Sequence, residues 1–154
     1  MKFIIDGISN NMPLVSAFGA WFAAQIFKFA VEIIQNKKLD FAKLVSSGGM
    51  PSSHSSAVCA LTTGVGMLEG ISSTSFAISF VRSLLVMYDA MGVRREAGKH
   101  SKILNNLIED LLDYKPEYFQ KNLKELIGHT PFQVLCGAIL GIVTPFGVIA
   151  IFHY

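Results

Sequence analysis

The stretch PLVSAFGAWFAAQIFKFAVEII, residues 13–34, is an apolar run that only two charged residues, Lys28 and Glu32, interrupt. A helix of about 20 predominantly apolar residues is long enough to cross the hydrocarbon core of a bilayer. A helix that is apolar on all of its faces is buried, either in protein or in lipid. The stretch therefore predicts a transmembrane helix.

The composition of the whole chain agrees with this prediction. Of the 154 residues, 51% are hydrophobic and 16% are charged, and the mean hydropathy is +0.46, whereas soluble domains carry about 25% charged residues. Three more apolar segments follow, at residues 53–68, 75–91 and 131–152, and the first two of these are short for spanning helices. We expect an all-α, polytopic membrane helix bundle with about four transmembrane helices. Residues 1–154 should form a single integral membrane domain.

The connection between the last two apolar segments contains SKILNNLIEDLLDY, in which apolar residues recur at helical spacing. These residues are Ile103, Leu104, Leu107, Ile108, Leu111 and Leu112. The pattern predicts an amphipathic helix in this third connection. Packing on the membrane surface or on a partner helix is its expected role.

The basic residues lie mainly in two connections, the one after the first apolar segment and the one after the third. The positive-inside rule places both connections in the cytoplasm and both chain termini outside. The N-terminus has an acidic residue after three apolar ones and no small-residue cleavage site, so we expect no removable signal peptide. The net charge of +2, with no basic helical face, excludes nucleic acid as an expected partner.

The stretch GGMPSSHSSAV, residues 48–58, combines glycine, proline and serine with a histidine at the start of the second apolar segment. Ser52 or Ser53 is the predicted N-cap of a helix, and a helix N-terminus attracts anions. His54 falls in the first turn, where its imidazole could deliver a proton to a bound anion. The alternative is a capped helix that carries a surface histidine.

The stretch GHTPFQ, residues 128–133, repeats this construction at the start of the last apolar segment. Thr130 is the predicted N-cap, Pro131 occupies the first helical position, and Gln133 completes a T-x-x-Q capping box. His129 lies just outside the helix. A second histidine therefore accompanies a second helix start on the same predicted membrane face.

Several lysine and arginine residues add positive charge to the two histidines and the two helix starts. Arg94 and Arg95 can offer forked donors that suit the geometry of a phosphate. Lys28 lies within an apolar segment, so it should either pair with Glu32 one turn away or face a polar cavity. Arg82 is placed similarly and could extend its charged end toward the membrane surface.

Together, the histidines, the cations and the two helix starts predict a phosphate site with the parts for nucleophilic catalysis. One imidazole can attack phosphorus while a second protonates the departing alkoxide, and fixed positive groups stabilise the charge that develops. No pair of histidines or carboxylates has the spacing of a metal site on one helix. We expect neither a metal nor another cofactor.

At these motifs the chain resembles the divergent branch of the type 2 phosphatidic acid phosphatase superfamily, a group related to acid phosphatases and vanadium-dependent haloperoxidases. The resemblance covers nearly the whole chain and rests on GGMPSSHS, YDAMGVRREAG and GHTPFQVLCGAILG. The main superfamily has a lysine and an Arg-Pro motif, then P-S-G-H, then S-R-x5-H-x3-D. By this resemblance His54 is the general acid and His129 is the nucleophile.

The resemblance also implies that Arg94 or Arg95 binds phosphate and that Lys28 or Lys43 supplies the first cation. The implied catalytic residues are His129, His54 and Gln133, and the implied phosphate-binding residues are Lys28, Lys43, Ser52, Ser53, Arg94 and Arg95. This chain has P-S-S-H where the superfamily has P-S-G-H, and it has Gln133 at the position of the superfamily aspartate. An amide can orient an imidazole but cannot stabilise imidazolium as a carboxylate does. Asp89 and Glu125 are the carboxylates that could replace it.

The expected function is a metal-independent phosphatase in the membrane that hydrolyses a lipid or prenyl phosphate through a phosphohistidine. The alternative is a non-catalytic phospholipid-binding or transport protein that retains the anion site. The expected partners are the lipid phosphate substrate and membrane lipids, and homo-oligomer formation is left open. We expect the protein in a bacterial cell membrane, with the site on the cytoplasmic face.

Overall fold

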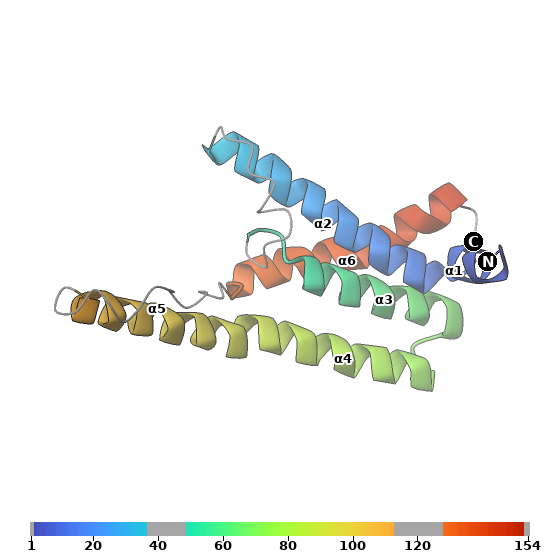
Figure 1. Cartoon of the computed structure of the whole chain (residues 1–154). Helices are drawn as coiled ribbons and strands as arrows, with labels where there is room; N and C mark the ends of the chain where they lie inside the picture. Colours follow the sequence, from blue (N-terminus) through green and yellow to red (C-terminus); the bar gives the residue numbers. More distant parts are fainter. Residues whose placement is uncertain (1, 37–48, 113–127, 153–154) are drawn as a thin grey trace.

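The computed structural model describes residues 2–36, 49–112 and 128–152, and all regular structure in these residues is helical (Figure 1). The helices are α1 (Lys2–Ser9), α2 (Met12–Asn36), α3 (Ser53–Glu69), α4 (Thr74–Met91), α5 (Val93–Leu112) and α6 (Pro131–Phe152). The predicted all-α membrane helix bundle is therefore confirmed. Helix α1 was not predicted, and the other helices lie where the sequence pattern placed them.

Serine and proline mark the helix starts. Ser52 and Ser73 are the N-caps of α3 and α4, and the Ser73 hydroxyl oxygen accepts a hydrogen bond from the Phe76 N–H at 3.1 Å. Helix α6 begins at Pro131 and continues through Pro145, which is fully buried. These are the residue types that favour helix starts, which is why the bounds could be predicted closely.

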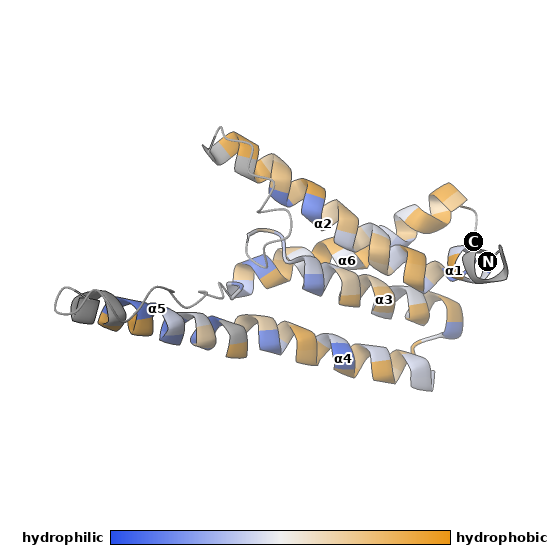
Figure 2. Cartoon of the chain, in the orientation of Figure 1, coloured by the Kyte–Doolittle hydropathy of each residue, from blue (hydrophilic) through white to orange (hydrophobic). Residues whose placement is uncertain are grey.

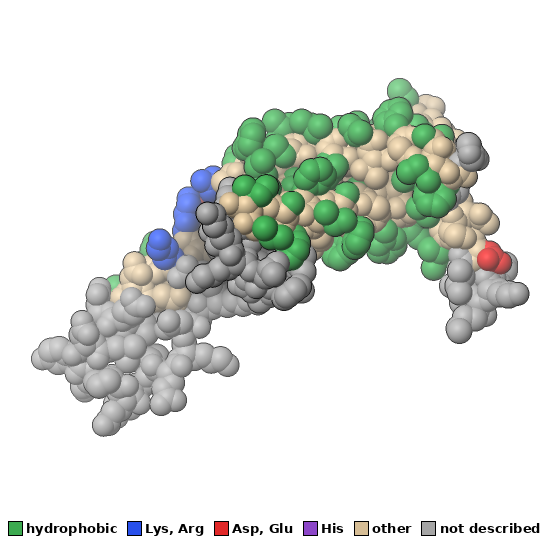
Figure 3. Space-filling view, turned by 90° about the horizontal axis from the view of Figure 1, so that it is seen from above, with side chains coloured by type: hydrophobic (Ala, Val, Ile, Leu, Met, Phe, Trp, Pro, Cys, Tyr) green, Lys and Arg blue, Asp and Glu red, His purple; other side chains and the backbone are tan. Residues whose placement is uncertain are grey.

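Three helices in the described part are long and apolar enough to cross a membrane, where the sequence predicts about four. They cover Met12–Val31, Thr74–Leu107 and Pro131–Phe152. Helix α3 has 17 residues, so it extends about 26 Å, less than the roughly 30 Å of a hydrocarbon core. Hydrophobic residues dominate α2, α4 and α6 (Figure 2), and many hydrophobic side chains are exposed on the face of the bundle seen in Figure 3.

The short helix α3 lies at the centre of the bundle and packs against α2, α4 and α6, while α2 also packs against α6 (Figure 1). Small residues allow this arrangement. Gly137 and Gly141 of α6 lie directly against the Ser52 and Ser56 carbonyl groups of α3, and Gly64 of α3 lies against Pro13 of α2. Membrane helices often use small residues in this way to bring their backbones close together.

Hydroxyl groups join α3 to α4 within the bundle. The Thr62 and Ser83 hydroxyl oxygens lie 2.7 Å apart, and the Ser83 hydroxyl also donates to the Val58 carbonyl at 3.0 Å. Hydrogen bonds between side chains of neighbouring helices stabilise membrane bundles because lipid offers the hydroxyl groups no other partner. The contacts also fix the antiparallel register of the two helices.

Helix α5 extends α4 beyond the end of the bundle, and only Gly92 separates the two helices (Figure 1). Its exposed apolar residues include Ile103, Leu104 and Leu107. The predicted helix in the third connection is confirmed, and it begins earlier than the apolar pattern indicated. Its residues Ile108, Leu111 and Leu112 have side chains outside the described set.

The polar clusters of the sequence meet at one end of the bundle. The starts of α3 and α6 and the end of α4 lie there, whereas α1, the α3–α4 turn and the end of α6 lie at the other end (Figure 1). Described Lys and Arg side chains gather toward the first of these ends (Figure 3). This arrangement positions the candidate site.

The close contact of α6 with α3 generates a prediction about stability. Replacing Gly137 or Gly141 with Ala should lower the free energy of unfolding by about 1–3 kcal/mol, because the new methyl group would overlap a carbonyl oxygen of α3. Thermal unfolding of the purified protein in detergent measures the effect. Gly147→Ala is the matched control, because nothing lies within 4 Å of the added Cβ. Equal unfolding temperatures for all three variants would contradict the packing described here.

Candidate active site

The start of α3 is a buried cluster of serine hydroxyl groups. Ser52, Ser53, Ser55 and Ser56 are each at most 2% exposed. The Ser52 hydroxyl oxygen accepts hydrogen bonds from the Ser55 hydroxyl at 3.0 Å and from the Ser55 N–H at 3.4 Å. This confirms Ser52, one of the two predicted residues, as the cap. A positively polarised helix end therefore lies inside the bundle, where it can attract an anion.

Lys28 places a positive charge beside this helix start. Its side chain is 8% exposed, and its Nζ donates a hydrogen bond to the Ser53 hydroxyl oxygen at 3.2 Å. Gly49, which has a φ of 94°, lies beside the Lys28 stem, and a Cβ added at Gly49 would be 3.7 Å from the Lys28 Cγ. Of the two expectations for Lys28, the structure shows the polar environment, while the Glu32 side chain lies outside the described set.

No ion pair neutralises Lys28 among the described side chains; the ion pair found there joins Lys99 to Glu96 at 2.6 Å. A buried ammonium group in a membrane protein is costly unless polar or charged groups surround it. The Lys28 ammonium group and the start of α3 both carry positive charge or polarity, and such an arrangement attracts anions.

The start of α6 forms the predicted capping box. The Thr130 N–H donates to the Gln133 Oε1 at 3.0 Å, and the Gln133 N–H donates to the Thr130 hydroxyl oxygen at 3.3 Å. The Gln133 Oε1 also lies 3.2 Å from the Nδ1 of His129. One amide oxygen thus serves both the helix cap and the histidine.

This shared oxygen determines the protonation pattern of His129. The atom of Gln133 that faces the Thr130 N–H must be the oxygen, because a backbone N–H can only donate. That oxygen can only accept, so the His129 Nδ1 must carry the proton that forms their hydrogen bond. In the neutral imidazole the lone pair then resides on Nε2. A nucleophilic histidine attacks with a nitrogen that carries such a lone pair.

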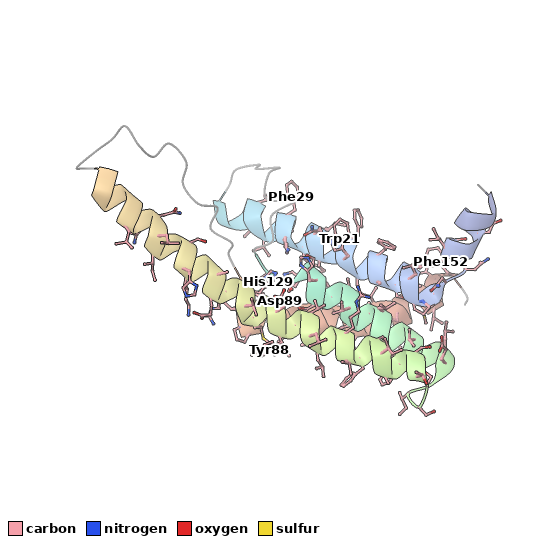
Figure 4. The ribbon with its side chains drawn as sticks, turned by 60° about the horizontal axis from the view of Figure 1, so that its bottom comes forward. Trp21, Phe29, Tyr88, Asp89, His129 and Phe152 are labelled. Carbon is pink, nitrogen blue, oxygen red and sulfur yellow. The ribbon has the colours of Figure 1, made fainter. Side chains whose placement is uncertain are left out.

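The backbone around His129 is fixed by the end of α4. The His129 N–H donates to the Ala90 carbonyl at 3.0 Å, and the imidazole is buried, with 3% of the residue exposed. Gly128 lies so close to the backbone of Arg95 that a Cβ would overlap it. Asp89 precedes Ala90 and lies at the same end of the bundle as His129 (Figure 4).

A backbone hydrogen bond connects the two helix starts. The Ser52 N–H donates to the Gln133 carbonyl at 3.0 Å. Lys28 thus contacts Ser53, and the adjacent Ser52 is bonded to Gln133, which in turn contacts His129. Five of the predicted site residues are brought together in this way.

His54 lies on a different face of α3. Residues Ser52 and Ser56 face α6, and His54 is roughly half a helical turn from both of them. Its side chain is exposed. The start of α3 therefore separates His54 from the α6 side, where His129 is located.

The structure describes only some of the remaining predicted site residues. Arg95 is exposed in the first turn of α5, and its backbone contacts Gly128. Lys43, Glu125 and the Arg94 side chain lie outside the described residues. Sequence reasoning missed the roles of Gly128 and Ala90, and a glycine directly before His129 was the available signal for a close backbone contact. No cluster of three or more metal-ligating side chains occurs in the described part.

Comparisons with known proteins agree with the motifs. The sequence profile of the Divergent PAP2 family matches residues 9–144. An uncharacterized membrane protein of Bacillus subtilis (strain 168), YuiD, is 41% identical over 143 residues, covering 86% of this chain and 90% of the relative. No solved structure matches the chain significantly.

The double role of Gln133 generates a prediction. Replacing Gln133 with Leu should lower the free energy of unfolding by about 0.5–2 kcal/mol, because the side-chain half of the capping box is lost. Gln133→Glu should have a smaller effect, since a carboxylate accepts the same hydrogen bonds. Thermal unfolding measures stability, and NMR of the labelled imidazole reports the tautomer of His129. A His129 proton on Nε2 in the wild type would contradict the assignment given above.

Proposed function

The chain belongs to the divergent PAP2 family, and from this premise we propose that it is a membrane-embedded phosphatase that hydrolyses a lipid or prenyl phosphate. The observation that carries the proposal is the hydrogen bond between the His129 Nδ1 and the Gln133 Oε1. This bond puts the lone pair of the neutral imidazole on Nε2, the atom that is proposed to attack phosphorus. The buried Lys28 contacts Ser53 at the start of α3, and the adjacent Ser52 is bonded to Gln133, so Lys28 and this helix start are the proposed phosphate ligands.

In the proposed reaction, the His129 Nε2 attacks phosphorus and forms a P–N bond while the P–O bond to the lipid breaks. Lys28 and the helix start stabilise the negative charge on the phosphoryl oxygens. The departing alkoxide takes a proton and leaves as the lipid alcohol. Water then attacks the phosphohistidine, releases phosphate and regenerates His129.

His54 is the proposed acid for the departing alkoxide. In-line displacement places the attacking and leaving atoms on opposite sides of phosphorus. His54 and the α6 side of the site lie on opposite faces of the start of α3, which supports a phosphate held above this helix end. Arg94 or Arg95 and Lys43 are proposed as further phosphate ligands.

Gln133 favours a second candidate function. Its amide orients His129 but brings no negative charge to stabilise the imidazolium that forms during attack. A phospholipid-binding or transport protein needs the anion site without this stabilisation. The same buried Lys28 and helix start would then hold a phosphate headgroup without cleaving it.

The two histidines should respond differently to substitution. His129→Ala should abolish phosphate release from every ester, because no other group can form the covalent intermediate. His54→Ala should slow alkyl phosphates by about 10²–10⁴-fold but aryl phosphates much less, since an aryl oxide needs little protonation to leave. Phosphate release from prenyl, glycerolipid and aryl phosphates by purified protein, with and without chelator, measures both effects.

His100→Ala is the matched control for these substitutions, because His100 is an exposed histidine on α5 outside the site. Equal losses on alkyl and aryl esters would overturn the role of His54. A wild-type protein that binds lipid phosphates but releases no phosphate would establish the binding or transport function instead.

We place the site on the cytoplasmic face of a bacterial cell membrane. The basic residues Arg95, Lys99 and Lys102 of α5 follow the site end of the bundle, and such residues favour the cytoplasmic side. A Lys99→Cys variant should resist an impermeant maleimide in intact cells, and a Ser72→Cys variant in the α3–α4 turn should react. Labelling of Lys99→Cys from outside would reverse the orientation.

A further inference from the structure

A cleft lies between α4 and α6, because both helices pack against α3 but make few contacts with each other. Its volume is about 280 Å³. The residues that define it are Cys59 and Thr62 on its floor, Phe80 and Met87 on the α4 wall, and Ala138 and Ile142 on the α6 wall. Both walls belong to helices long and apolar enough to cross a membrane. The cleft therefore opens sideways, toward lipid.

The surface of the cleft is suited to hydrocarbon. Two of its polar groups, the Thr62 and Ser83 hydroxyls, are already paired, since they lie within hydrogen-bond distance of each other and of the Val58 carbonyl. A cavity holds ordered water only when polar groups in its wall still need partners. Apart from Thr63, the remaining lining is aliphatic, aromatic or sulfur-containing. An apolar chain that fills the space therefore meets mainly apolar surface.

One end of the cleft reaches the candidate site. The Cys59 Sγ lies 3.9 Å from the Met87 Sδ. Cys59 follows Ser55 by one helical turn, and Met87 precedes Ala90, whose carbonyl accepts the His129 N–H, by nearly one turn. A molecule with its headgroup at the start of α3 could therefore extend a tail directly into the cleft.

We propose that this cleft binds one hydrocarbon chain of the lipid phosphate, which enters sideways from the bilayer while its phosphate occupies the start of α3. The inference rests on the proposed phosphate site and adds the place where the long chain of the phosphate ester binds. The volume equals that of roughly nine water molecules at about 30 Å³ each, so it accommodates part of a single chain. A second chain of the same lipid would remain in the bilayer.

Photolabelling tests the binding site without requiring turnover. Hexadecyl phosphate with a diazirine midway along its chain should label cleft residues of α4 and α6 in the detergent-solubilised full chain. Unlabelled hexadecyl phosphate should compete, and hexadecanol should compete much less. The matched probe is diazirine-bearing hexadecanol, which lacks the phosphate. Equal labelling by both probes, or labelling outside the cleft, would overturn the proposal.

A pair of tryptophan substitutions tests the effect on turnover. Ile142→Trp fills the cleft, whereas Ile139→Trp adds the same bulk at a similarly exposed residue of α6 that does not line it. Ile142→Trp should lower the ratio of hexadecyl phosphate to aryl phosphate turnover by about tenfold, the scale of discrimination in apolar pockets. Ile139→Trp should leave this ratio unchanged. Equal ratios in both variants would overturn the cleft as the tail site.

The two experiments distinguish a failure of the proposed phosphatase from a failure of the proposed tail site. Absence of turnover with every ester, together with phosphate-dependent labelling of the cleft, would remove the phosphatase and keep the lipid phosphate site. Turnover of hexadecyl phosphate without labelling of the cleft would keep the phosphatase and remove the tail site.

Discussion

The hydrogen bond from the Ser52 N–H to the Gln133 carbonyl is the contact on which the site depends. It satisfies a backbone donor at the start of one helix with an acceptor in the first turn of another. The bond can form because Gly137 brings the backbone of α6 against that of α3. In a bilayer, where water cannot replace a lost partner, this contact holds the anion-attracting end of α3 beside His129.

Helix positions and caps could be predicted from the sequence because they depend on local chemistry. Proline at a first helical position, serine and threonine at caps, and apolar runs of suitable length each act within a few residues. The number of spanning helices was harder to predict, because α3 is rich in small polar residues and is shorter than its neighbours. Its central position depends on packing with three other helices, which no local pattern shows.

The site was predicted in part. Lys28, Ser52 and Ser53 were predicted to bind phosphate from the cost of a buried amine and from helix-start chemistry, and the structure brings them together with His129 and Gln133. The sequence presented helix capping and imidazole orientation as alternative roles of Gln133. In the structure one oxygen atom performs both, because His129 directly precedes the N-cap. The face of α3 on which His54 lies depends on where α6 packs, so only the structure could show it.

The junction between α4 and α5 has a mechanical consequence. Gly92 separates two helices that continue in nearly the same direction, and the first turn of α5 lies against Gly128 with no room for even one more carbon atom. A close-packed contact of this kind transmits displacement instead of absorbing it. A displacement of α5 about Gly92 would therefore also displace Gly128 and the peptide unit that joins it to His129.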